Sequence, residues 1–435
     1  MLVKQRNLVV VGCGKLGAPL IACLANVGHK VTGIDLNKDL IHNLNAGIVT
    51  WNEPGLEDLI SKNIGNIHFE TTYEGAFVDS DATFVIVPTP SVNSGEFSNK
   101  FVLEAVTSIG KELSKSIAKE HLVVIVSTVM PGSTQGEIKD VLLAAVGNSS
   151  MNLQICYSPE FIALGTVIKN MQYPDMILIG EEDVWAGDVL TDISLSIVKN
   201  EPVVMRLSLV EAEISKIAIN SFVTTKISFS NQISEICEST PGASAKKVLE
   251  AIGSDSRIGS SYLSAGTGYG GPCFPRDNRA FRTYANTIGV KADLAIATDV
   301  INVRQDQRII RLVESKLAPG SRLLVVGLSY KPDTDVTEES PAVAFIGKAQ
   351  QAGFLVDALD EHVTFINSPR PIEIYTPDKL SDRDYSGAIL FVPSKNYLDI
   401  PRSFGSQTIL IDLWGLWEGL LNFDYTRLGD FLEVN

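Results

Sequence analysis

A glycine-spaced turn near the N-terminus restricts the possible folds of this chain more than any other feature. The apolar run Asn7–Val11 predicts a buried strand, and a glycine-rich turn and an apolar stretch with helical periodicity follow it. The turn has the spacing G-x-G-x-x-G. Its first glycine allows a tight turn, its second lets the backbone approach a pyrophosphate, and its third packs helix against strand. The pattern therefore predicts an α/β domain that binds a dinucleotide. The residues expected to contact the dinucleotide are Gly12, Gly14, Lys15, Leu16 and Gly17.

A carboxylate after the second predicted strand indicates which dinucleotide binds. Asp35 ends the apolar run Lys30–Asp35, at the position where an acidic side chain accepts hydrogen bonds from an adenosine ribose. Such a carboxylate repels a 2′-phosphate, and no arginine follows it directly, although Lys38 is close. We therefore expect NAD rather than NADP as the cofactor.

Short β-branched runs alternate with helical stretches through the first part of the chain. Further strands are predicted at Ala82–Val87 and His121–Ser127, with strand ends at Cys156-Tyr157 and Met176–Ile179. Runs that are apolar on both faces indicate a parallel sheet covered by helices. We expect this NAD-binding domain to span residues 1–202.

Two long helices are predicted in the middle of the chain. Ser208–Thr240 contains almost no glycine or proline, begins at a serine cap and ends before Pro241. Ala292–Leu317 has the same character. We expect a central helical region at residues 203–316, either a subunit interface that makes a homodimer or simply part of the core.

The α/β pattern restarts at Ser321 and defines a third region, residues 317–435. A helix is predicted at about Pro341–Gly353. Strands are predicted at Arg322–Val326, Phe354–Ala358, Ala388–Val392 and Thr408–Ile411. The expected fold class is α/β, with two Rossmann-like parallel-sheet domains joined by a central long-helix region.

Charge and cysteine content restrict the partners and the compartment. A net charge of -15 argues against a nucleic-acid surface and against adhesion to anionic membranes. Five cysteines without repeat spacing indicate a reducing, cytoplasmic compartment, and the low count of five histidines argues against a structural metal site. The glycines that interrupt Leu8–Gly28 favour strand, turn and helix over a signal peptide or membrane segment.

A second glycine-rich segment, Gly266–Asp277, carries the candidate nucleophile. Cys273 follows the glycines directly, and a helix that begins near Pro275 would place its thiol at a positive helix terminus, which favours thiolate. Asp277 would lie on the same side of that turn. The competing interpretation is an ordinary buried cysteine after a turn.

A nicotinamide cofactor together with a reactive cysteine narrows the possible chemistry. Oxidation of an alcohol requires no covalent nucleophile, whereas further oxidation of the aldehyde requires one. The thiolate forms a thiohemiacetal, which loses hydride to become a thioester that water hydrolyses. This combination indicates oxidation of an alcohol to an acid with two NAD molecules.

Several segments, in order, resemble the UDP-glucose/GDP-mannose dehydrogenase family, and the Gly266–Asp277 loop resembles its signature. The other matching segments are Val87-Pro88-Thr89-Pro90, Ser127-Thr128-Val129, Ser158–Ala163, Glu213–Asn220, Gly327–Pro332 and Glu339–Ala342. The resemblance implies a nucleotide-diphosphate hexose as substrate, oxidised at C6, and a UDP-binding C-terminal domain. It also places Pro88, Thr89 and Thr128 beside NAD.

The same resemblance assigns catalytic roles. The implied set is Cys273, Lys216, Asp277, Glu160, Asn220 and Thr128. Lys216 and Asn220 are one helical turn apart, so both can face one oxyanion or water. Lys216 would stabilise an alkoxide or act as a base, Glu160 would serve hydrolysis as a general base, and Asp277 and Thr128 would hold the water.

A second group of residues is expected to bind the sugar nucleotide. The resemblance adds Phe161, Tyr269, Gly270 and Lys331, together with Arg257 reaching across a subunit boundary. The implied partner is therefore a second copy of the chain.

Departures from the family pattern leave the sugar open. Leu164, Leu40 and Trp414 stand where some relatives have a glutamate, an arginine and another arginine. UDP-glucose is the expected substrate, with GDP-mannose and UDP-N-acetylhexosamines as alternatives. The pattern also leaves open a single-step dehydrogenase of the 6-phosphogluconate or hydroxyacid type, and a non-catalytic NAD-binding sensor.

Overall fold

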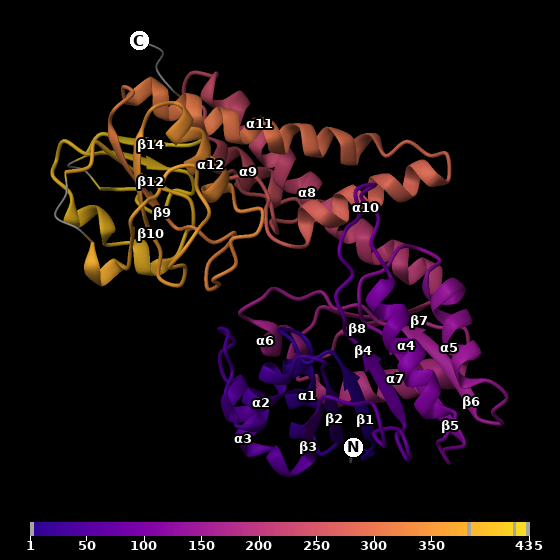
Figure 1. Cartoon of the computed structure of the whole chain (residues 1–435). Helices are drawn as coiled ribbons and strands as arrows, with labels where there is room; N and C mark the ends of the chain where they lie inside the picture. Colours follow the sequence, from indigo (N-terminus) through magenta and orange to yellow (C-terminus); the bar gives the residue numbers. More distant parts are fainter. Residues whose placement is uncertain (1–3, 381–383, 421–422, 432–435) are drawn as a thin grey trace. The chain divides into compact units, whose positions relative to one another are not determined.

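The computed structural model describes residues 4–380, 384–420 and 423–431. The chain divides into two compact units, one ending at Ile217 and the other beginning at Ala218, and each contains its own sheet (Figure 1). This bears out the expected fold class of two Rossmann-like sheets and long helices. The division into three regions at residues 202 and 316 stays a proposal.

The first unit contains an eight-stranded sheet in the order β3-β2-β1-β4-β5-β6-β7-β8. Its strands are β1 Asn7–Val11, β2 Lys30–Ile34, β3 Ile67–Glu70, β4 Ala82–Val85, β5 Glu120–Ile125, β6 Asn152–Tyr157, β7 Met176–Gly180 and β8 Val203–Leu207. Pairing is parallel from β3 to β6, whereas β7 pairs antiparallel with β6. The sheet is thus mixed at one edge. Strand β8 pairs parallel with β7, so the sheet continues past residue 202.

Helices cover both faces of this sheet because side chains alternate along each strand. On β1, Leu8 and Val10 pack in the core that contains α1 and α7, and Val9 and Val11 pack in the core that contains α4 and α5. The helices are α1 Gly17–Asn26, α2 Lys38–Asn45, α3 Leu56–Lys62, α4 Lys100–Leu113, α5 Lys139–Val146, α6 Val167–Gln172 and α7 Val184–Ile197. Two short turns complete the unit, η1 Ile64–Asn66 and the π-helical η2 Thr134–Ile138.

The second unit contains a six-stranded parallel sheet in the order β11-β10-β9-β12-β13-β14. Its strands are β9 Arg322–Val326, β10 Leu355–Leu359, β11 Ile374–Tyr375, β12 Gly387–Leu390, β13 Ile409–Asp412 and β14 Tyr425–Arg427. The short turns are η3 Pro377–Lys379, η4 Lys395–Tyr397 and η5 Ile400–Ser403.

The long helices begin and end close to the predicted positions. Helix α8 spans Leu209–Glu238 and continues from the first unit into the second, and α11 spans Asp293–Lys316. The remaining helices are α9 Ala245–Gly253, α10 Phe274–Thr287 and α12 Pro341–Gln351. Helices α11 and α12 bury Val313 and Phe345 against the second sheet. Within the part of the chain that the structure describes, every helix is too short or too polar to cross a membrane.

Candidate active site

The glycine turn after β1 has the shape that a dinucleotide site requires. Gly12 has φ +99°, and a Cβ on it would lie 2.0 Å from the Ile86 carbonyl oxygen after β4. A Cβ on Gly17 would lie 1.8 Å from the Gly12 carbonyl oxygen. A Cβ on Gly14 would meet no described atom within 4 Å, so this face of the turn is open. The turn lies between β1 and β4, where the strand order reverses and ligands of such sheets bind.

The start of α1 and the end of β2 also fit NAD. Helix α1 has no acidic residue in its first turn, and Leu16 supplies no side-chain cap, so the helix terminus suits a diphosphate. Asp35 accepts hydrogen bonds from the Cys13 N–H (2.9 Å) and the Asn37 N–H (2.9 Å) but stays half-exposed. Lys15, in the turn itself, is also half-exposed. These features hold a carboxylate at the place where the ribose is expected.

The loops after β4 and β5 are joined to each other. The Thr89 hydroxyl donates to the Thr128 carbonyl oxygen (2.7 Å), and the Val87 N–H donates to the Ser127 hydroxyl (2.9 Å). Pro88, in the loop after β4, is exposed. Because both loops follow parallel neighbouring strands, they lie at the same sheet edge as the glycine turn.

Glu160 and Phe161, in the loop after β6, contact Lys216 on α8. The Lys216 Nζ donates to the Glu160 carbonyl oxygen (2.7 Å) and lies 4.5 Å from the centre of the Phe161 ring. The lysine side chain is only 7% exposed. Burial raises the pKa of the Glu160 carboxyl to about 7, and the nearby Lys216 lowers this pKa in part. A carboxyl that titrates near neutral pH suits proton transfer.

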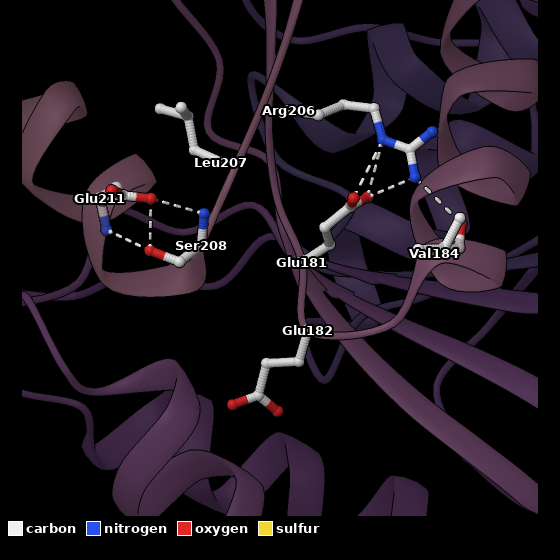
Figure 2. A pocket seen from close by; sticks show the side chains of 7 residues that line it. All are labelled: Glu181, Glu182, Val184, Arg206, Leu207, Ser208 and Glu211. Atoms are coloured by element: carbon white, nitrogen blue, oxygen red, sulfur yellow. Dashed lines mark hydrogen bonds and ion pairs between the residues drawn. The ribbon is translucent and has the colours of Figure 1, made fainter.

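The start of α8 is held firmly, and this positions Lys216. The Glu211 carboxylate accepts from the Ser208 N–H (2.9 Å) and hydroxyl (2.6 Å), and the Glu211 N–H returns a bond to that hydroxyl (3.4 Å; Figure 2). This is a capping box, and it lowers the pKa of Glu211. The fully buried Glu213 accepts from the N–H groups of Gly132 (2.5 Å) and Thr134 (2.8 Å).

The hollow in Figure 2 lies beside this capping box but contains none of the predicted site residues. Arg206 in it pairs with Glu181 (2.9 Å) and with Asp188, so its charges compensate one another. The residues that line it are Glu181, Glu182, Val184, Arg206, Leu207, Ser208 and Glu211. No cluster of three metal-binding side chains occurs among the described residues.

In the second unit, Asp277 and Asn220 contact each other. The Asp277 carboxylate accepts from the Asn220 amide (2.6 Å) and from the Arg276 guanidinium (3.2 Å), and it is only 1% exposed. Its N–H donates to the Cys273 carbonyl oxygen (2.8 Å), which closes the first turn of α10. Because Asn220 follows Lys216 by one turn of α8, this helix carries both predicted groups.

Cys273 is the N-cap residue of α10 and is exposed, whereas the other four cysteines are buried. The structure thus contradicts the interpretation of Cys273 as an ordinary buried cysteine. Burial is the main cause that raises the pKa of the Tyr330 hydroxyl, and the charges of the nearby Cys273 and Tyr262 raise it further. Tyr262 has φ +60° and meets Phe274 edge to face, with 6.1 Å between ring centres. Sequence reasoning missed Tyr262, because nothing in its local sequence marks a left-handed backbone.

The remaining predicted substrate residues lie in different surroundings. Tyr269 is buried and its hydroxyl donates to Asp299 (2.6 Å). The Lys331 Nζ lies 6.0 Å from the centre of the Tyr330 ring, and that tyrosine is in turn near Cys273. Arg257 does not join this group: its side chain is 86% exposed and pairs with Asp255 (2.6 Å).

Family comparisons cover most of the chain. Residues 6–197 match the NAD binding domain of the UDP-glucose/GDP-mannose dehydrogenase family, residues 210–304 its central domain, and residues 324–419 its UDP binding domain. The first match confirms NAD as the cofactor.

Individual relatives agree with this match. UDP-glucose 6-dehydrogenase AglM of Haloferax volcanii is 36% identical over 82% of this chain and 84% of its own length. UDP-glucose 6-dehydrogenase YwqF of Bacillus subtilis is 33% identical over 81% of this chain and 79% of its own. A UDP-glucose dehydrogenase structure from Pyrobaculum islandicum has a TM-score of 0.86 at 27% identity and covers 99% of both chains. The chain therefore belongs to the UDP-glucose/GDP-mannose dehydrogenase family and is an NAD-dependent nucleotide-sugar dehydrogenase.

Proposed function

We propose that this enzyme oxidises the C6 hydroxyl of UDP-glucose to a carboxylate in two steps through a thioester on Cys273. The observation that carries the proposal is the exposed Cys273 at the N-terminus of α10, next to the Asn220–Asp277 pair. The names of the relatives AglM and YwqF favour UDP-glucose over other sugar nucleotides. GDP-mannose and UDP-N-acetylhexosamines stay as alternatives.

In the first step the C6 hydroxyl becomes an aldehyde. NAD, when bound, accepts the hydrides that leave the sugar carbon. The buried Lys216 ammonium, held by the Glu160 carbonyl oxygen, stabilises the alkoxide that forms when the hydroxyl loses its proton. The Asn220 amide, one turn further along α8, orients the oxygen.

In the second step the Cys273 thiolate adds to the aldehyde carbon and forms a thiohemiacetal. The N-terminus of α10 favours the thiolate. Loss of the second hydride and a proton produces the thioester. Asp277 and Thr128 orient a water, Glu160 accepts its proton, and the thiol leaves. The balance is RCH₂OH + H₂O → RCOO⁻ + 2 H⁻ + 3 H⁺.

The test counts NADH and acid product with UDP-glucose, GDP-mannose and UDP-N-acetylhexosamines. We expect about two NADH per acid with UDP-glucose, as sequential hydride transfers require. Cys273→Ser should make no acid while it still binds NAD. One NADH per product, or full activity of Cys273→Ser, would favour a single-step dehydrogenase. Binding of NAD without turnover of any sugar would favour a sensor.

We further propose a homodimer that uses α8 and α11. Phe222, Phe229 and Ile236 are exposed and recur every seven residues on α8, and Val300 and Val303 are exposed on α11. A regular apolar seam on a long helix suits packing against a second helix. Sedimentation should therefore give twice the mass of the chain.

The cytoplasm is the proposed compartment. All five cysteines are thiols rather than disulfides, and four of them are buried, which suits reducing conditions. Fractionation of cells that express the chain would test this placement, and recovery outside the cytoplasm would contradict it.

A further inference from the structure

The segment that leads to Cys273 is held by side-chain amides rather than by strand pairing. Asn231 on α8 accepts from the Gly266 N–H (3.0 Å) and donates to the Thr267 carbonyl oxygen (3.1 Å). Asn302 on α11 accepts from the Tyr269 N–H (2.8 Å) and donates to the Tyr269 carbonyl oxygen (3.0 Å). Each asparagine thus satisfies a backbone donor and a backbone acceptor, as a neighbouring strand would.

Helix α11 presents a row of polar residues to this segment. Asp299, Asn302, Gln305 and Arg308 follow one another at intervals of three, so each lies beside the next and the row winds around the helix. Asp299 accepts from the Tyr269 hydroxyl, and the Gln305 amide donates to the Gly266 carbonyl oxygen (2.5 Å). Three successive members of the row thus contact the segment directly.

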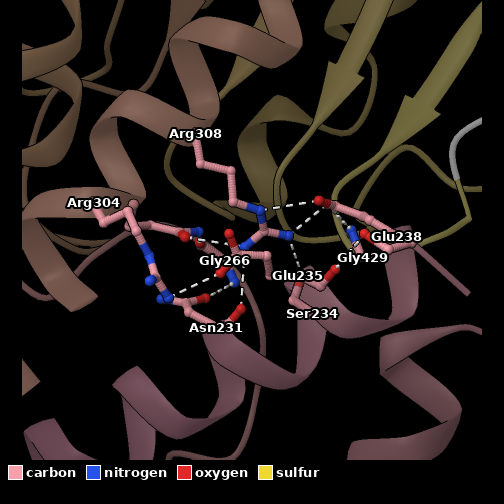
Figure 3. A network of polar contacts seen from close by, with 10 residues as sticks. Asn231, Ser234, Glu235, Glu238, Gly266, Arg304, Arg308 and Gly429 are labelled. Atoms are coloured by element: carbon pink, nitrogen blue, oxygen red, sulfur yellow. Dashed lines mark hydrogen bonds and ion pairs between the residues drawn. The ribbon is translucent and has the colours of Figure 1, made fainter. Parts of the chain in front are cut away.

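Arg308, the fourth member, orients Gln305. One Arg308 N–H donates to the Gln305 side-chain oxygen (3.0 Å), which directs the amide nitrogen of Gln305 toward Gly266. The other donors reach Glu238 (3.0 and 2.5 Å), the Asn231 carbonyl oxygen (3.2 Å) and Ser234 (2.7 Å; Figure 3). All five N–H groups of this guanidinium are therefore used inside the protein. The arginine is only 6% exposed, so its charge serves the network rather than a phosphate ligand.

Three glycines of the segment lie so close to neighbouring atoms that a side chain on any of them would clash. A Cβ on Gly266 would lie 2.6 Å from the Trp414 ring, and one on Gly268 would lie 2.5 Å from the Asn302 side-chain oxygen. A Cβ on Gly270 would lie 2.2 Å from the Glu339 carbonyl oxygen. The backbone from Gly266 to Gly270 is thus enclosed on several sides, whereas Cys273, three residues further on, is exposed.

We propose that Asn231, Asn302 and Gln305 are positioning residues for the Cys273 thiol, with Arg308 acting through Gln305. The proposal rests on the proposed role of Cys273 as nucleophile. A nucleophile must approach its carbon along a narrow path, and a displacement of about 1 Å can cost about a hundredfold in rate. Fixing the backbone at Gly266–Tyr269 places Cys273 without any contact between the amides and the substrate.

The test uses the full-length enzyme and the variants Asn302→Ala and Gln305→Glu. The second variant is isosteric: it keeps the acceptor for Arg308 and loses the donor to Gly266. We expect kcat to fall roughly 10- to 100-fold, with the KM for UDP-glucose and the Kd of NAD changed less than about threefold. The pH midpoint of Cys273 alkylation by iodoacetamide should shift as well. The other cysteines are buried, and Cys273→Ser supplies the labelling blank.

Two variants separate positioning from stability. Ile309→Val removes a methylene from the core side of α11, so it should lower the unfolding temperature and leave kcat unchanged. Arg304→Gln breaks the exposed pair with Glu235 (2.9 Å) beside the same network and should change neither. If Asn302→Ala does not fold, Asn302→Asp takes its place. Unchanged kcat and alkylation in folded Asn302 and Gln305 variants would overturn the proposal.

Failure of the proposed function is distinguishable from failure of this inference. Full activity of Cys273→Ser would remove the thioester mechanism, whereas the alkylation profile reports the placement of the thiol in either case. An alkylation midpoint in Gln305→Glu equal to that of the parent enzyme would show that the amides do not set that placement.

Discussion

The carboxyl of Glu160 links turnover to pH. Burial holds its pKa at about 7, so it loses its proton over the pH range where most enzymes work. General-base catalysis of thioester hydrolysis requires the ionised form, so kcat should rise as the pH increases through about 7. Glu160→Gln should lower kcat by roughly 10²- to 10⁴-fold and remove this acid limb. The measurement is kcat at saturating substrate from about pH 5 to pH 9.

A matched control for Glu160 is Glu182→Gln. Glu182 pairs with Lys139 near the surface (2.5 Å), so its loss should leave the acid limb in place. An acid limb with the same midpoint in Glu160→Gln would show that another group accepts the proton.

His121 predicts a second pH effect, on stability. It is fully buried, with Nδ1 2.8 Å from the Ser80 carbonyl oxygen and Nε2 2.9 Å from the Thr83 hydroxyl, and burial lowers its pKa to about 4. Because the unfolded chain takes up this proton near pH 6.5, stability is lost as the pH falls from about 6.5 to 4, by roughly 3 kcal/mol. His121→Gln should flatten the dependence of the urea midpoint on pH, and exposed His42→Gln should not. Equal slopes in His121→Gln and the parent would contradict this account.

Some residues of the candidate site could be proposed from the sequence and others could not. Cys273 and Asp277 stand beside a glycine cluster that signals an unusual backbone, so a local pattern makes them candidates. Asn231 and Asn302 resemble solvated polar positions on long helices, because the chain segment that they bind is far from each of them in sequence. The hydrogen bonds of these two asparagines depend on tertiary packing, which local periodicity does not encode.

At the level of elements, two glycines of the NAD turn separate folding from binding. Gly17→Ala would place a Cβ 1.8 Å from the Gly12 carbonyl oxygen and should destabilise the protein by about 1–3 kcal/mol or more. Gly14→Ala enters open space, so the enzyme should fold normally and lose NAD affinity by roughly tenfold or more, about 1.4 kcal/mol. Thermal unfolding would measure the stability, and calorimetric titration with NAD would measure the affinity.

Gly65→Ala is the control: its Cβ also enters open space but lies outside the turn, so it should change neither stability nor NAD affinity. Parental NAD affinity in Gly14→Ala would contradict the proposed placement of the diphosphate.

The turn after β9 has the same backbone hydrogen bond as the turn after β1, but its carboxylate is occupied within the protein. The Gly327 N–H bonds the Leu359 carbonyl oxygen (2.8 Å) as the Gly12 N–H bonds that of Ile34 (2.8 Å). Asp360, in the place of Asp35, accepts from four backbone N–H groups and is only 1% exposed. Its carboxylate is therefore not available to a ribose, and we expect one NAD per chain by equilibrium dialysis. Two NAD molecules per chain would contradict this comparison.

Local signals explain which elements were predictable. Ser208 and Glu211 form a capping box, so the start of α8 could be read from the sequence. Strand β8 could not be, because its side chains are mostly exposed and its pairing with β7 depends on a distant segment. The reversal of direction between β6 and β7 is likewise a tertiary property that the strand sequences do not contain.

At the level of the whole molecule, the exposed seam of α8 predicts assembly. Phe222 and Phe229 are 63% and 43% exposed, which is costly for two aromatic side chains one heptad apart. Replacing both by glutamate should convert the dimer to a monomer in analytical ultracentrifugation. Replacing the exposed Ile117, which belongs to the first unit and to neither α8 nor α11, by glutamate should leave the dimer intact. A Phe222/Phe229 double variant that stays dimeric would place the interface elsewhere.

Arg257 provides the sharpest test of whether the assembly completes the active site. Its side chain is 86% exposed and within its own chain pairs with nearby Asp255, so a substrate contact in a second copy is open to it. Arg257→Ala and Cys273→Ala should each be inactive alone. In a mixed dimer, the site with an intact Cys273 would receive the intact Arg257 of its partner. Random co-assembly makes half of the dimers mixed, with one intact site in each, so co-expression should restore about a quarter of parental activity. If Arg257 acts within its own chain, both sites of the mixed dimer carry a lesion and no activity returns.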